Sequence, residues 1–293
     1  MTMALVVAAP DAVAEPESAL RSALLWSFIP GGGFFYLDEP GTGIAYAATT
    51  AAFLGVGAEV ERRNRKLGRD DEVNVPALVG EKVWEYSIFS TFRTALARDG
   101  VDLRAERFDD TPTRLLLSAP FRPSVALTWP VAGAALFGVA AAALTAQHPR
   151  GRLSDVERAR MLGSDFNRND ATALYTASAA GISLGAATAE EGLFRGILQT
   201  VLQERFGDTA GLWGAAGTFG AAHIIAPDGS VNPAGVAFGT GAGLYLGWLY
   251  NRDGNRLAEP IAAHFWYDFM VLTTNWLMDP NATDFGFRVD FKF

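Results

Sequence analysis

The feature that most constrains this chain is a series of long apolar stretches separated by short polar segments. A helix that crosses a lipid bilayer needs about 20 predominantly apolar residues, and several stretches approach that length. They lie at approximately 41–58, 124–147, 171–189, 209–226, 232–250 and 257–278. A weaker stretch, 22–37, contains Pro30 and three glycines that would bend or break a helix. We therefore predict an all-α fold, a polytopic transmembrane helix bundle with roughly six to eight membrane segments.

A soluble helical protein with buried Ala-rich helices is the alternative, because the apolar stretches are only moderately hydrophobic. Apolar residues make up 49% of the chain, which is close to the soluble average and does not separate the two classes. Several nearly contiguous apolar stretches are, however, hard to bury in a soluble core of 293 residues. The membrane protein is therefore the favoured interpretation.

The charge and the absence of cysteine exclude several classes of function. The formal net charge is −8 and there are no cysteines. A nucleic-acid-binding protein normally presents a basic face, so we expect no nucleic-acid partner. Disulfide bonds, thiol catalysis and cysteine-ligated metals are excluded as well.

The polar segments between the apolar stretches indicate how the chain is organised. Residues 79–98 mix aromatic with charged side chains, a pattern typical of a helix lying at the membrane interface. The positive-inside rule favours the cytoplasm for both 59–122 and 150–170, yet a single span separates them, so the orientation stays open. We predict an N-terminal membrane region, 1–164, with two short apolar helices, a charged and interfacial segment and one span. A second region, 165–293, holds every motif with chemical content.

The segment AEEGLFRGILQ, residues 189–199, places charges at the end of an uncharged stretch. An unpaired charge within lipid is costly, so such residues need a reason to be there. Glu191 and Arg195 are four residues apart and would face each other on a helix as an ion pair. Glu190 would point about 100° away around the helix, with no cation of its own in this segment, and is a candidate general base. A salt bridge at a helix end on the membrane surface explains the same pattern equally well.

Two of the three histidines of the chain lie in apolar stretches beside other polar groups. His223 stands near the end of GTFGAAHIIAP, and His264 precedes Asp268 by four residues in AEPIAAHFWYDFM. Taken singly, a packing hydrogen bond or a local His–Asp pair explains each of them. Taken with the glutamates, they place acid and imidazole groups on three separate helices, and ionisable residues inside a membrane bundle are usually functional. The third histidine, His148, borders a charged loop and is given no role.

Four glycines at strict four-residue spacing indicate a packing surface. On a helix they would share one face and let a neighbouring helix approach closely. A phosphate-binding loop would need a preceding strand and a following Lys or helix start, and the sequence shows neither. The predicted packing residues are Gly235, Gly239, Gly243 and Gly247.

Taken in order, EEGLFRGILQ, FGAAH and EPIAAHFWYD resemble the motifs EExxxR, FxxxH and HxxxN of one known family. It is the CAAX prenyl protease and bacteriocin-processing (CPBP) family of intramembrane endopeptidases. The second motif matches at Phe219 and His223, and the third matches at His264 but has Asp268 where the family usually has Asn. The resemblance covers roughly 165–280. The ordered trio is far more specific than any one of the motifs.

The resemblance implies roles for the matching residues. Glu190 would activate a water molecule that attacks a peptide carbonyl, with His223 helping to hold that water. His264 and Asp268 would stabilise the oxyanion that develops. An ionised Asp268 would repel an oxyanion, so it would have to stay protonated, orient His264 or bind a cation. The residues implied to support this site structurally are Glu191, Arg195 and Phe219.

The metal requirement stays open at this point. Glu190, His223 and His264 would form a His₂Glu set, the ligand type of catalytic zinc, which makes divalent zinc a possible cofactor and would leave Glu191 as a possible base. The HExxH signature of zinc proteases is absent. A glutamate-type mechanism without metal fits the residues as well, and we favour it slightly over a metalloendopeptidase.

We therefore expect an intramembrane endopeptidase, integral to a bacterial inner membrane, whose protein or peptide substrate enters from the lipid bilayer. The location follows a loose resemblance of residues 30–47 to a small bacterial membrane module of two short helices. A non-catalytic membrane scaffold or self-immunity protein is one alternative. A cation carrier that uses the same polar cluster is another.

Overall fold

The computed structural model describes residues 19–66, 74–145, 153–162, 164–225, 230–280 and 288–291. His148 and parts of the segments that link the helices lie outside these ranges. Each of the six predicted apolar stretches corresponds to a helix, so the predicted helix bundle is confirmed. These helices are α3 (Pro40–Lys66), α7 (Trp129–Thr145), α8 (Arg168–Glu191), α10 (Asp208–Ala222), α11 (Pro233–Arg252) and α12 (Ala258–Met278).

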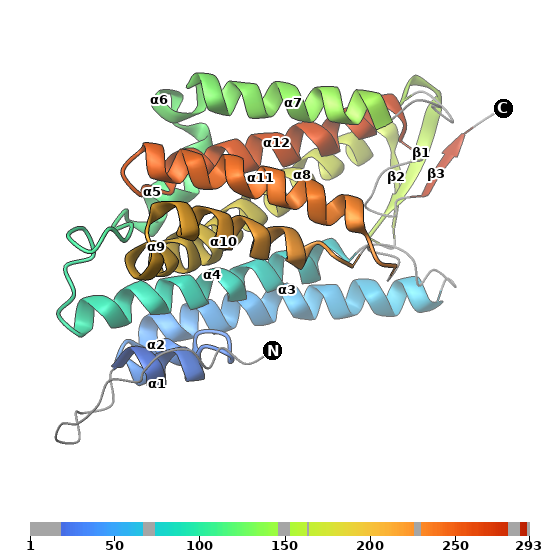
Figure 1. The fold of residues 1–293 in the computed structure, drawn as a ribbon. Helices are drawn as coiled ribbons and strands as arrows, with labels where there is room; N and C mark the ends of the chain where they lie inside the picture. Colours follow the sequence, from blue (N-terminus) through green and yellow to red (C-terminus); the bar gives the residue numbers. More distant parts are fainter. Residues whose placement is uncertain are drawn as a thin grey trace.

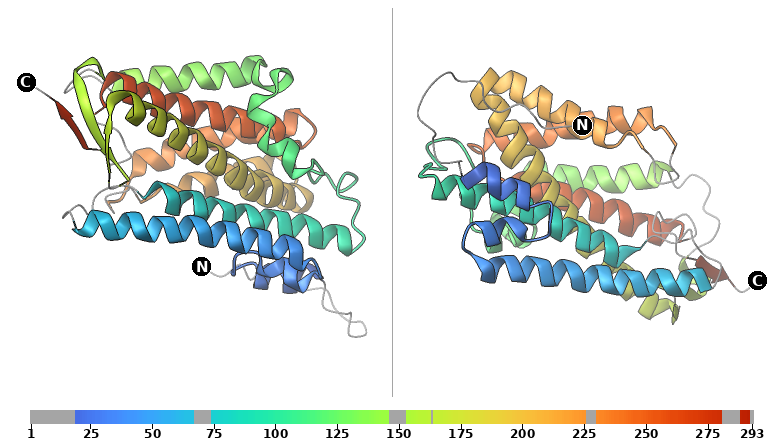
Figure 2. Two further views of the ribbon diagram at one scale, coloured as in Figure 1. Left: turned by 180° about the vertical axis from the view of Figure 1, so that it is seen from behind. Right: turned by 90° about the horizontal axis from the view of Figure 1, so that it is seen from below.

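The long helices run side by side, roughly along one direction (Figure 1). Helix α12 packs against α7 and α8, α10 packs against α11, and α4 (Val75–Arg98) packs against both α3 and α8. The views from behind and from below show α8 crossing the interior of the bundle between α4 and α12 (Figure 2). The remaining helical segments are α5 (Thr113–Leu117), α6 (Pro123–Ala126), α9 (Thr200–Phe206), short 3₁₀ turns at Ala119–Phe121 and Leu153–Asp155, and a π-helical segment at Gly192–Gln199.

The number of membrane segments is not confirmed by the length and composition of the helices. Within the described ranges, α3 is the one helix that is both long and apolar enough to cross a bilayer on these criteria. Helix α7 is apolar over Trp129–Leu144 but is too short to meet the length criterion for a span. The remaining helices carry Gly, Ser, Thr and ionisable residues, which lower their hydropathy, and many of these side chains face the interior of the bundle.

The outer faces of several helices nevertheless expose large apolar side chains. Leu136, Phe137 and Leu144 on α7 are each more than half exposed, as are Trp213 on α10 and Phe28 before α2 (Gly32–Tyr36). Exposed apolar surface of this extent is uncommon on soluble monomers and indicates contact with an apolar environment. The surface therefore agrees with a bundle embedded in lipid.

The bent segment predicted at 22–37 is present as two short helices. Helix α1 (Ala19–Trp26) ends before Pro30, and α2 begins after Gly31, whose φ of 72° lies in the left-handed region that favours glycine. Residues 79–98 lie in α4, which packs against α3 and α8, and the placement of this segment at a membrane interface stays a prediction. Its Tyr86 and Phe89 recur at helical spacing and are buried.

A small antiparallel sheet is the main departure from the all-α prediction. Strands β1 (Val156–Met161), β2 (Ser164–Asn167) and β3 (Arg288–Phe291) form a sheet of order β2-β1-β3 at one end of the bundle (Figure 1). The strands are short and rich in charge, so they lack the apolar alternation that predicts a strand. Strand β2 lies across the division predicted at residue 165, and that division stays a prediction.

Candidate active site

Acid and imidazole groups from α8 and α12 converge at the C-terminal end of α8. Glu191 Oε1 lies 2.8 Å from His264 Nδ1, and Asp268 Oδ2 lies 3.3 Å from His264 Nε2. Glu190 Oε2 lies 4.0 Å from the same Nε2 atom. Because a carboxylate can only accept, Nδ1 of His264 donates to Glu191. Three carboxylates therefore surround one imidazole ring, and its Nε2 faces the other two.

The Glu191–Arg195 pair predicted from their spacing is present and fully buried. Arg195 Nη1 lies 3.0 Å from Glu191 Oε1, and the two side chains are 1% and 0% exposed. Arg195 Nη2 donates to the Gly243 carbonyl at 3.1 Å, and the guanidinium lies 4.6 Å from the ring centroid of Phe219. Two buried atoms of the pair, Glu191 Oε2 and Arg195 Nε, have no hydrogen-bond partner among the described residues, so the pair is only partly satisfied. Through its other contacts, Arg195 links α8, α10 and α11.

The helix that carries Arg195 is wound as a π-helix over Gly192–Gln199. The Thr200 hydroxyl donates to the Arg195 carbonyl at 3.1 Å, a spacing of five residues. π-helical turns are rare and occur frequently at functional sites. The sequence analysis missed this segment, because the wider winding leaves no distinct pattern in the amino-acid sequence.

His223 lies at the C-terminal end of α10. Its Nδ1 is 2.8 Å from the Phe219 carbonyl oxygen, and its ring centroid is 4.8 Å from that of Phe219. A carbonyl only accepts, so Nδ1 carries the proton of this hydrogen bond, and Nε2 of the neutral ring remains an acceptor. His223 can therefore receive a hydrogen bond from a water molecule through Nε2.

A cavity of about 640 Å³ lies between α7, α10, α11 and α12. His223, His264 and Asp268 line it together with apolar and aromatic side chains, among them Phe137 and Phe238. Glu190 is not among the lining residues, although its carboxylate lies 4.0 Å from His264. The cavity thus offers a mostly apolar volume with a few polar groups at one wall, which is typical of a site for a small part of a larger substrate.

The four glycines at the predicted spacing lie along the side of α11 that approaches α10. A Cβ atom on Gly239 would lie 3.1 Å from Gly220 Cα and 3.2 Å from His223 Nδ1. A Cβ on Gly243 would lie 2.9 Å from Ala216 Cα, and one on Gly247 would lie 2.6 Å from Leu212 Cδ1. A Cβ on Gly235 would contact the Asn232 side chain. The missing side chains allow α10 to approach closely, which places His223 beside α11.

Lys82 on α4 is a residue of the site that the sequence analysis did not identify. Its Nζ lies 3.3 Å from Glu190 Oε1 and 2.9 Å from Glu85 Oε2. The available signal was a single lysine, flanked by two glutamates, in a helix that otherwise carries large aromatic residues. Assigning that helix to the membrane interface gave the lysine an ordinary solvent-facing role and hid its contact with Glu190.

The candidate zinc ligands do not form a ligand set. Within the described ranges, no three His, Asp or Glu side chains are grouped as a bound metal ion requires. Glu190 Oε1 lies 3.3 Å from Lys82 Nζ, and Nδ1 of His223 is bonded to the Phe219 carbonyl, which leaves Nε2 of His223 as an acceptor. The described side chains form no ready ligand set, and the zinc assignment stays a prediction.

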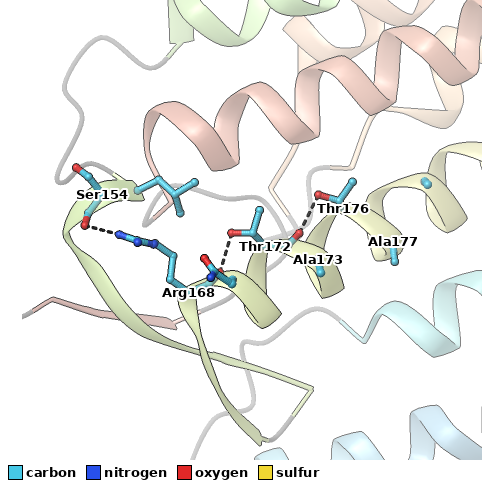
Figure 3. Close-up of a pocket in the computed structure, with 9 residues that line it drawn as sticks. Ser154, Arg168, Thr172, Ala173, Thr176 and Ala177 are labelled. Carbon is cyan, nitrogen blue, oxygen red and sulfur yellow. Dashed lines mark hydrogen bonds between the residues drawn. The ribbon is translucent and has the colours of Figure 1, made fainter.

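A second concavity lies beside the sheet, away from these residues (Figure 3). Its volume is about 920 Å³, and no acid or imidazole lines it. Arg168 donates to the Ser154 carbonyl at 2.8 Å, and Thr172 donates to the Arg168 carbonyl at 2.8 Å. Its polar groups are thus used in local backbone contacts, and the chemistry of the chain is concentrated at the first cavity.

A comparison with known protein families shows which family the region containing this cluster is similar to. The model of the family described as type II CAAX prenyl endopeptidase Rce1-like matches residues 172–270. This part of the chain is similar to the CAAX prenyl protease family. The matched region contains Glu190, His223, His264 and Asp268, and the resemblance inferred from the three motifs is confirmed. The chain matches no curated protein and no solved structure.

The similarity of this region to the CAAX prenyl protease family supports an intramembrane protease in general, and with it a peptide substrate and a membrane environment. The matched region ends before β3 and begins after α4. Lys82, on α4, therefore lies outside the matched region.

Proposed function

We propose that the chain is an intramembrane endopeptidase that hydrolyses a peptide bond with water activated by Glu190. The observation that carries the proposal is that Glu190 and Asp268 both approach His264 Nε2 to within 4.0 Å, beside a cavity that His223 also lines. General base catalysis needs a carboxylate within reach of a water and of the bond to be broken. Glu190 is the carboxylate that we assign to this role.

In the proposed reaction, the carboxylate of Glu190 takes a proton from water while the water oxygen attacks the carbonyl carbon of the peptide. His223 accepts the second hydrogen of that water through Nε2 and so orients it. The carbonyl oxygen becomes an oxyanion. Glu190 then gives its proton to the departing amide nitrogen, the C–N bond breaks, and a carboxylic acid and an amine leave. No other reactant is consumed besides the water.

The oxyanion requires a hydrogen-bond donor, and His264 or Asp268 on α12 can provide one. With a proton on Nε2, His264 would donate to the oxyanion while Nδ1 remains bonded to Glu191 at 2.8 Å. A protonated Asp268 would donate in the same way that the usual Asn does. Donors aimed at the developing charge are among the largest contributions to catalysis.

The structure of the site also suggests the form of the substrate. The cavity is walled by aromatic rings from α7, α11 and α12, so an apolar side chain or lipid group next to the scissile bond would suit it. We place the chain in the inner membrane of a bacterium on the loose resemblance of residues 30–47. The substrate would then reach the cavity from the bilayer or its surface.

The experiment uses the full chain in detergent micelles with two internally quenched fluorescent peptides. One ends in a farnesylated Cys-aliphatic-aliphatic-X sequence, and the other is the same peptide without the farnesyl group. We expect the wild-type chain to cleave at least one of them. Glu190→Gln removes the base but keeps the size of the side chain, so cleavage should fall to background while folding is retained.

The matched control is Glu61→Gln, because Glu61 forms an exposed pair with Arg65 on α3 and does not line the cavity. It should cleave as the wild type does. Full activity of Glu190→Gln, or no cleavage of either peptide by the wild-type chain, would contradict the proposal. A scaffold or self-immunity role predicts that Glu190→Gln is silent, and a cation carrier predicts proton or metal flux in vesicles.

A further inference from the structure

We infer that Lys82 is a positioning residue that holds the Glu190 carboxylate with one oxygen turned toward His264. This inference rests on the proposed function and adds a residue to it from outside the matched region of 172–270. Helix α4 thereby contributes directly to a site whose other groups come from α8, α10 and α12.

The position of Lys82 is built into the packing of α4 against α8. Gly185 lies on α8 one turn before Glu190, and a Cβ atom there would lie 3.0 Å from Lys82 Cβ and 3.5 Å from Lys82 Cγ. The absence of a side chain at Gly185 thus leaves the space that the stem of Lys82 occupies. The stem lies along α8, and the ammonium group reaches Glu190 Oε1 at 3.3 Å.

The two oxygens of Glu190 have different surroundings. Oε1 faces the Lys82 ammonium at 3.3 Å, and Oε2 faces His264 Nε2 at 4.0 Å. Each of these two neighbours has a second carboxylate beside it: Glu85 lies 2.9 Å from Lys82 Nζ, and Asp268 lies 3.3 Å from His264 Nε2. Like charges repel, and the Lys82 ammonium, which contacts Glu190, counters that repulsion and holds the carboxylate in place.

The cluster is partly buried, which makes the contact more than a surface ion pair. The side chains of Lys82 and Glu190 are 17% and 19% exposed. Exposed pairs contribute little because water screens them and the long side chains lose entropy. A mostly buried pair, such as Lys82 and Glu190, is screened less by water and salt. Without the ammonium, the carboxylate would be free to adopt rotamers that turn Oε2 away from His264.

The experiment measures kcat and KM of Lys82→Met, Lys82→Arg and Glu61→Gln with the quenched peptide that the wild-type chain cleaves. Lys82→Met keeps the length of the stem and removes the charge. We expect its kcat per folded molecule to fall about tenfold or more, because small misplacements of a reacting group have effects of this size. KM should change less than about twofold, since Lys82 does not line the cavity.

Lys82→Arg restores a cation at the same place and should recover most of kcat, while Glu61→Gln, in an exposed pair on α3, should leave both constants unchanged. Thermal unfolding separates this role from a purely structural one, which would lower the midpoint of unfolding without lowering kcat per folded molecule. Wild-type kcat in folded Lys82→Met overturns the inference, and so does a Lys82→Arg variant as slow as Lys82→Met. If Glu190→Gln is inactive in the same assay, such a result leaves the proposed function standing.

Discussion

The close approach of α10 and α11 gives the sharpest test of how the site is assembled. Gly243 lies at the middle of the glycine series, and Gly243→Ala adds one methyl group there. That methyl carbon would lie 2.9 Å from Ala216 Cα and 3.1 Å from the Ala216 carbonyl oxygen. Both are backbone atoms, which cannot rotate away as the end of a flexible side chain can. The helices must move apart to accept the change.

The size of the effect follows from these distances. Carbon atoms in contact normally lie about 3.5–4.0 Å apart, so the helices would have to separate by roughly 0.5–1 Å at this point. Inserting a methyl group into a packed region costs about 1–3 kcal/mol. Alanine also favours a helix over glycine by about 1 kcal/mol, which offsets part of that cost. A control has to remove this second contribution.

Gly217→Ala on α10 is that control, because a Cβ at Gly217 meets nothing within 4 Å. Both variants gain the same helix preference, so the difference between their free energies of unfolding isolates the contact with Ala216. We expect Gly243→Ala to be less stable than Gly217→Ala by about 1–3 kcal/mol in equilibrium unfolding from detergent micelles. Equal stability, or a more stable Gly243→Ala, would refute the close packing on which the position of His223 depends.

Two further predictions concern the buried pair and the departure from the family motif. Arg195→Met leaves Glu191 buried without its cation and should destabilise the chain by about 3–5 kcal/mol, whereas Arg62→Met, in an exposed pair, should leave the unfolding curve nearly unchanged. Equal unfolding curves for the two would contradict the structural role of Arg195. Asp268→Asn keeps a donor for the oxyanion and should retain peptide cleavage, while Asp268→Ala should lower kcat about a hundredfold. Full cleavage by Asp268→Ala would remove Asp268 from the mechanism.

The helices could be predicted from the sequence because apolar composition and length report directly on burial. The bend before Gly31 could also be predicted, since a proline and three glycines interrupt the stretch. The sheet formed by Val156–Met161 and its partners could not, because its stability comes from pairing between segments far apart in the chain. The number of membrane crossings stays a prediction, since Ala- and Gly-rich helices with inward-facing polar groups carry a weak hydropathy signal.

The candidate residues were recognisable because each pair lies within a single helical stretch. The Glu191–Arg195 pair and the His264–Asp268 pair both have the four-residue spacing that brings side chains together on one helix face. Lys82 was not, because its partner Glu190 lies more than a hundred residues later in the chain. The π-helical winding at Gly192–Gln199 was hidden for a related reason. It depends on the packing around Arg195 and not on a residue pattern.

The sequence by itself determined which helices form, which acid and imidazole groups they carry, and where small residues let two helices approach. Each of these properties is set by neighbours within about one helical turn. Only the tertiary structure decided that Glu190 is held between Lys82 and His264, that three carboxylates surround one imidazole, and that His223 opens on the same cavity as Asp268. Those relations depend on how each helix is rotated about its axis and shifted along it relative to its neighbours. The packing of whole helix faces sets this rotation and shift, and local sequence does not.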